Sequence, residues 1–176
     1  SLPFALESHV LDFCALDELA ALLHVSHDME KLLHAHFRSI NTLRIDLQQT
    51  TVARVEAAVS MAMRAQLLRM LVDRTGRLQR IVLDGVQPLL TPHILWTTWL
   101  TELIAANRSS LRSLARQEEV FDDPLPPEIV LALATCPELR EFGTECTKSE
   151  FDNELLLLLQ SCRKLGRVSL PAAYND

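Results

Sequence analysis

One apolar pattern recurs along the chain and constrains its fold more than any other feature. It consists of an apolar residue, two variable residues, a second apolar residue, one variable residue and a third apolar residue. The clearest copies begin at Ile40, Leu78, Leu139 and Leu165, and a worn copy begins at Leu111. Segments with helical periodicity separate the copies. A short strand followed by a helix, repeated in this way, is typical of a curved solenoid.

The pattern predicts an α/β fold with short parallel strands and outer helices. Strands are expected at 40–47, 78–84, 111–114, 139–144 and 165–170. Helix starts are expected at Ser26 or Asp28, after Pro92 and at Pro126-Pro127, because short polar residues cap helices and proline fits a first turn. Two parts follow: a small helical segment at 1–38, and an irregular solenoid of about five strand–helix units at 39–176.

The composition fits a folded binding protein better than several other classes. Of 176 residues, 48% are hydrophobic and only 23% are charged, which is enough for a core and argues against disorder. The net charge is -6 and the cations are scattered, so a nucleic-acid partner is not expected. The apolar runs are far too short to span a membrane.

Cysteine usage bears on the compartment. Cys14, Cys136, Cys146 and Cys162 are widely spaced and form no C-x-x-C pair, so we expect buried thiols in a reducing compartment, cytoplasmic or nuclear. The chain opens at Ser1 without Met, which leaves open a lost targeting segment, organellar presequences included.

The C-terminal third resembles the cysteine-containing leucine-rich repeats of F-box proteins. Cys136-Pro137-Glu138-Leu139-Arg140-Glu141-Phe142 is similar to the Cys-Pro-x-Leu opening of that repeat, and the stretch from Cys162 to Leu170 repeats it without the proline. Cys146 lies near the place where the family often has another buried cysteine. The resemblance implies a leucine-rich-repeat solenoid, most clearly at 130–170.

The N terminus resembles an F-box. Leu2-Pro3, an apolar helix, Glu18-Leu19 after Asp17 and the step Val25-Ser26 match the motif in order. The resemblance implies a substrate-recognition adaptor of a cullin-type (SCF-like) ubiquitin ligase, whose partners are a Skp-type linker subunit and a protein substrate. The implied linker-binding residues are Leu2, Pro3, Leu6, Val10, Leu11, Leu19, Leu22 and Met29.

Strand alternation predicts a second surface. Residues between the repeated apolar positions should face the concave side, where arginine suits a carboxylate or phosphate. The alternative is that these are ordinary solvated strand residues. The candidate partner-binding residues are Arg44, Asp46, Arg80, Val82, Asp84, Glu141, Glu145 and Arg167.

The sequence gives no positive sign of an enzyme. It has no Gly-rich phosphate loop, no G-x-S-x-G and no H-E-x-x-H. His24, His27, His34 and His36 cluster, but no ligand set at standard zinc spacing accompanies them, so no metal or cofactor is expected. The prediction is a non-catalytic interaction module. The alternative to the ligase adaptor is a scaffold subunit of a large assembly, which Met29 in place of the family's usual Trp and the irregular spacings favour.

Overall fold

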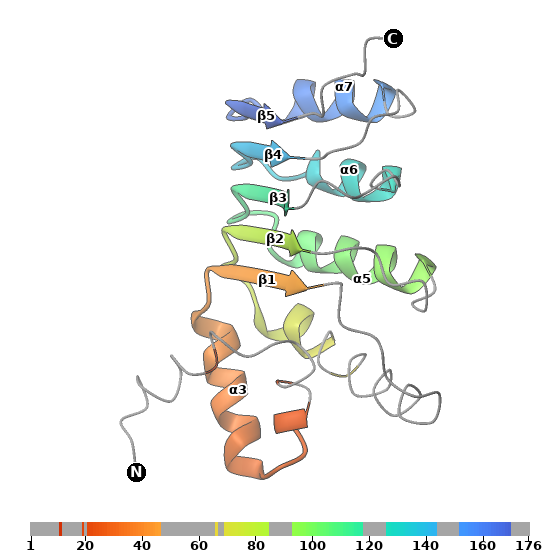
Figure 1. Ribbon diagram of the computed structural model, residues 1–176. Helices are drawn as coiled ribbons and strands as arrows, with labels where there is room; N and C mark the ends of the chain where they lie inside the picture. Colours follow the sequence, from red (N-terminus) through yellow and green to blue (C-terminus); the bar gives the residue numbers. More distant parts are fainter. Residues whose placement is uncertain are drawn as a thin grey trace.

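The computed structural model describes residues 11, 19, 21–46, 66, 69–84, 93–117, 126–143 and 152–169. Within them runs a five-stranded parallel sheet whose strands follow one another in chain order (Figure 1). The strands are β1 (Thr42–Asp46), β2 (Arg80–Asp84), β3 (Ser113–Gln117), β4 (Glu141–Gly143) and β5 (Arg167–Ser169). The α/β class expected from the sequence is confirmed.

Helices connect most of these strands. The helices are α3 (His27–Ser39), α5 (His93–Ala106), α6 (Pro127–Leu133) and α7 (Asp152–Ser161). Parallel neighbours need a crossover connection, and a helix between strands supplies it. In Figure 1, α5, α6 and α7 lie on one side of the sheet, in the same order as the strands they connect.

Local sequence explains where two helices begin. The Ser26 hydroxyl accepts a hydrogen bond from the Met29 N–H at 3.2 Å, so Ser26 caps α3 as expected. Pro127 occupies the first turn of α6, where its missing N–H costs nothing. Residues 69–74 are also helical, in agreement with the helical periodicity before the second strand. The earlier residues of this expected helix lie largely outside the described part of the chain.

The core lies between the helices and the inward-facing strand residues. Leu33 and Phe37 of α3, and Leu100 and Leu103 of α5, are at most 1% exposed. Trp99 is also buried and belongs to the core. Burial of this many leucines is the main stabilising contribution for a chain with few aromatics.

Each strand begins two residues after the leading apolar residue of its repeat. The leading residues therefore lie in the turns before the strands, not within them, and they belong to the hydrophobic core or pack against it. Leu78, Leu111 and Leu139 are fully buried there. The expected strand positions were right, but their starting bounds were two residues early.

These turns are joined by a repeated backbone contact. In each turn, one carbonyl accepts hydrogen bonds from two consecutive N–H groups of the next turn. The acceptors are Asn41, Gln79, Arg112 and Arg140, and the donor pairs are Gln79–Arg80, Arg112–Ser113, Arg140–Glu141 and Gly166–Arg167, at 2.7–3.0 Å. We call this contact the turn ladder. It provides hydrogen-bond partners for backbone groups of the turns and joins each turn to the next.

A buried polar side chain ties two units together. Asn107 is 0% exposed, and its side-chain oxygen accepts from the Leu78 N–H at 2.9 Å. Its amide nitrogen donates to the Thr75 hydroxyl at 3.1 Å and to the Leu103 carbonyl at 2.9 Å. Fully satisfied buried networks of this kind specify one packing arrangement.

Candidate functional site

The side of the sheet turned away from the inward apolar residues is the candidate site. Along each strand, alternate residues point to opposite sides. Leu43, Ile81, Leu114 and Phe142 point inward and are at most 6% exposed. The residues between them form what we call the open face. Its described members, in register across the strands, are Thr42, Arg80, Ser113, Glu141 and Arg167, followed by Arg44, Val82, Ala115, Gly143 and Ser169.

The first row of the open face carries charges of both signs. Arg80, Glu141 and Arg167 are exposed, and Ser113 between them is buried. The Ser113 hydroxyl donates to a Glu141 carboxylate oxygen at 3.3 Å. Glu141 and Arg167 are register partners on neighbouring strands. The sheet thus brings together, as expected, three candidate residues that are distant in the sequence.

The second row is flatter. Arg44 is exposed at its start, and the next residues, Val82, Ala115 and Gly143, are small. A Cβ at Gly143 would lie 3.8 Å from the Ser169 Cβ and 3.9 Å from the Ala115 Cα, which is ordinary contact distance. The second row therefore has few projecting side chains that a partner could contact.

Val82 differs from the expectation of an accessible contact residue. It is only 6% exposed. The reason is its position in an interior strand, where Arg44 and Ala115 are its register neighbours on the two sides. Asp46 and Asp84 are register partners at the ends of β1 and β2, as strand alternation predicts. Glu145 lies outside the described residues.

The candidate linker-binding residues divide into three groups. Leu2, Pro3, Leu6 and Val10 lie outside the described residues. Leu11 and Leu19 are 4% and 5% exposed and belong to the hydrophobic core. Leu22 and Met29 are half-buried and pack against that core. Among the described residues, this set is therefore engaged mostly within the chain itself.

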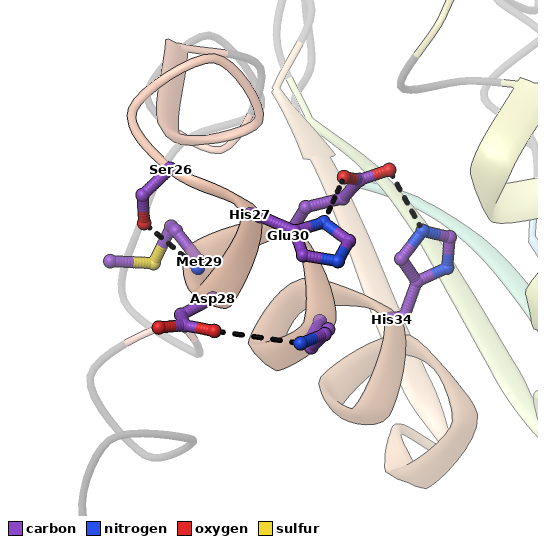
Figure 2. A network of polar contacts seen from close by, with 7 residues as sticks. Ser26, His27, Asp28, Met29, Glu30 and His34 are labelled. Atoms are coloured by element: carbon purple, nitrogen blue, oxygen red, sulfur yellow. Dashed lines mark hydrogen bonds and ion pairs between the residues drawn. The ribbon is translucent and has the colours of Figure 1, made fainter.

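Helix α3 carries a polar network near its start (Figure 2). The Glu30 carboxylate lies 3.2 Å from His27 Nδ1 and 3.6 Å from His34 Nε2. The hydrogen bond with His27, together with the contact with His34, lowers the pKa of Glu30. His34 Nδ1 is buried without a hydrogen-bond partner, so a proton there would be unsatisfied. Within the described ranges, no three His, Cys, Asp or Glu residues are arranged to hold a metal ion.

The two described cysteines are buried, as expected. Cys136 and Cys162 are free thiols at 0% and 2% exposure. The Cys162 sulfur lies 3.4 Å from the Cys136 carbonyl oxygen, so it contributes to unit stacking. Burial raises the pKa of Cys136 to about 11 and also raises the pKa of Cys162. Both thiols are thus protonated at neutral pH and are poor nucleophiles. Cys14 and Cys146 lie outside the described residues.

Sequence reasoning missed two groups of residues. Asn107 was not singled out, although it stands four residues before Leu111, close to where Cys136 and Cys162 precede their own repeats. The turn arginines were treated as scattered. Alignment of the repeats on their leading leucines would have put Arg112 and Arg140 at the same position.

Comparison with protein-family models finds no match to this chain, and no curated protein matches it significantly. In the part of the chain that the structure describes, no helix is both long and apolar enough to cross a bilayer. The assignment of a function therefore rests on the sheet and its surfaces.

Proposed function

We propose that this chain is a non-catalytic protein-interaction module, built as an irregular leucine-rich-repeat solenoid with an F-box-like helical cap. The observation that carries the proposal is the sheet of five parallel strands in chain order, joined by the turn ladder. Such stacking presents one continuous face to a macromolecule, which is how repeat proteins bind. The mixed charges of Arg80, Glu141 and Arg167 on that face suit a polar protein surface.

The favoured role is that of a substrate-recognition adaptor of a cullin-type ubiquitin ligase. The supports are the F-box-like order of residues 2–26 and the buried cysteines at the repeat positions of Cys136 and Cys162. An adaptor of this kind needs no catalytic residue, because it acts by holding the substrate near the transferring enzyme. The N-terminal segment would bind a Skp-type linker, and the open face would bind the substrate.

A scaffold subunit of a multiprotein assembly is the second candidate. One observation favours it: Leu11 and Leu19 are buried within the core of this chain. Residues used to complete the fold are less available to a linker. In that case neighbouring subunits, not a linker and a substrate, would contact the open face.

Binding to a purified Skp-type linker separates the two roles. We expect micromolar or tighter affinity, measured by calorimetry, and weaker binding when Leu2-Pro3 is changed to Ala-Ala. Absence of association between the purified components would reject the adaptor role and favour the scaffold.

The open face has its own test. Arg80→Glu with Arg167→Glu should reduce binding of any protein that co-purifies with the chain through this face, because both arginines are exposed and in the same row. Lys31→Glu with Arg69→Glu, at exposed helical positions, is the control with the same charge change. Unchanged partner binding in the arginine variant would remove the open face from the proposal.

A further inference from the structure

The turns before β2, β3, β4 and β5 gather cations that are dispersed in the sequence. We define the turn edge as residues 75–79, 107–112, 134–140 and 162–166. It holds six of the 17 Lys and Arg residues of the chain but only one of the 23 Asp and Glu residues. All six cations are exposed: Arg77, Arg108, Arg112, Arg140, Arg163 and Lys164. An acidic chain thus has one strongly basic edge.

The turn ladder places these turns directly above one another. The Arg112 carbonyl accepts from the Arg140 N–H at 2.7 Å, and the Arg140 carbonyl accepts from the Gly166 N–H at 2.9 Å. Neighbouring strands lie about 4.8 Å apart, so exposed arginines on successive turns are close. Like charges side by side are destabilising. The fold alone gives no reason for this arrangement.

Glu138 is the acidic residue of the turn edge, and it interacts with the cations there. It accepts a hydrogen bond from the Lys164 ammonium group. Its pKa is lowered, chiefly by that hydrogen bond, with contributions from the charges of Arg140 and Arg112. One native carboxylate therefore lies in a field produced by three cations, which leaves positive charge available for further carboxylates.

We propose that the turn edge docks a short acidic segment of a protein partner, with its Asp and Glu side chains paired to Arg112, Arg140 and the neighbouring turn cations. Arginine binds carboxylates through two parallel hydrogen bonds. Three strand spacings cover roughly 14 Å, the length of four or five extended residues. The occupant is therefore a short stretch of chain.

Two observations favour an acidic peptide over nucleic acid. No residue of the turn edge is aromatic, so nucleobases have no stacking platform there. The remainder of the chain has twice as many acidic as basic residues, 22 against 11, and would repel a long polyanion. The proposal does not depend on the proposed function, because none of the six cations belongs to the open face.

The test is fluorescence anisotropy with the full chain and a labelled peptide of alternating Asp and Glu, at low and at physiological salt. The probes for comparison are the same peptide with Asn and Gln, and a short DNA duplex. We expect the acidic peptide to bind, the neutral peptide to bind at least about tenfold more weakly, and salt to weaken the binding of the acidic peptide.

Matched variants locate the binding. Arg112→Glu with Arg140→Glu should weaken acidic-peptide binding at least about tenfold, whereas Lys31→Glu with Arg69→Glu, with the same charge change away from the turn edge, should alter it little. Glu138→Gln should tighten binding, because it removes the internal carboxylate that competes for the same cations. Circular dichroism checks that each variant is folded.

Four results would overturn the proposal. The first is no peptide binding at low salt. The second is an equal loss in both double charge-reversal variants, which would show that only net charge matters. The third is duplex DNA bound as tightly as the peptide and lost in the Arg112/Arg140 variant, which would make the edge a phosphate-binding surface instead. The fourth is a Glu138→Gln variant that binds the peptide no more tightly, which would show that the cations around Glu138, Lys164 among them, do not take up the carboxylates of the peptide.

Discussion

The last two strand–helix units have nearly the same sequence pattern but different burial. Phe142 on β4 is 2% exposed, and its register partner Val168 on β5 is 36% exposed. The leading residue Leu139 is fully buried, whereas Leu165 is only partly buried. The helices differ in the same direction: α7 exposes Leu156, Leu157 and Leu159, and α6 exposes Leu131.

The difference shows that burial in this fold comes from the next unit as much as from the residue itself. β4 has a strand on both sides, and β5 pairs only with β4 among the described strands. In repeat proteins, the class that we propose for this chain, stability is approximately a sum of the contributions of each unit and of its contacts with its neighbours. An interior position should therefore contribute much more than the same position in the terminal unit.

The largest effect is expected at the interior position. Phe142→Ala removes a buried aromatic side chain between two strands and should lower the free energy of unfolding by about 3–5 kcal/mol. Urea denaturation followed by circular dichroism measures the loss. A loss under about 1 kcal/mol would contradict the comparison, because it would mean that neighbouring units add little.

An intermediate effect is expected from the buried thiol of the interior unit. Burial raises the pKa of Cys136 to about 11 in the folded chain. In the unfolded chain the thiol has its ordinary pKa near 9, so between pH 9 and 11 the folded chain keeps a proton that the unfolded chain releases. The contribution of this pKa difference to the free energy of unfolding is therefore fully present below pH 9. It falls as the pH rises from 9 to 11. The fall is at most about 3 kcal/mol.

Cys136→Ala isolates this term from other groups that titrate in the same range. The variant should be less stable at pH 8, and its stability should fall less steeply between pH 9 and 11 than that of the parent chain. Parallel curves for the two chains would show that Cys136 does not contribute to the pH dependence.

The smallest effect is expected at the terminal position. Val168→Ala removes two methyl groups from a partly exposed side chain and should cost less than about 1 kcal/mol. The same denaturation experiment compares it with Phe142→Ala. A cost equal to that of Phe142→Ala would show that Val168 is covered in solution, and the contrast between the two units would then disappear.

The apolar spacing in the sequence located the strands because the inward positions of a strand must alternate. Leu43 and Ile45, for example, are both buried, as the pattern requires. The strand starts were misplaced because Leu78 and Leu111 are buried in the core although they lie in the turns before the strands, and periodicity alone does not distinguish such burial from burial within a strand.

The surfaces were harder to predict than the strands. The face of Arg80, Glu141 and Arg167 followed from alternation, but the burial of Val82 depends on which strands flank β2. The turn edge was missed because charge patches were sought among neighbours in the sequence. Stacking brings Arg112 beside Arg140, although a strand and a helix separate them along the chain.

The brevity of β5 has a consequence for solubility. An outer strand with unpaired amides is a template on which other chains can assemble into fibrils. Among the described strands β5 is an outer one, has only three residues and starts with an exposed arginine, Arg167. Short length and positive charge are two common protections against such templating. Replacing Arg167 with a β-branched apolar residue would remove one of these protections and favour aggregation.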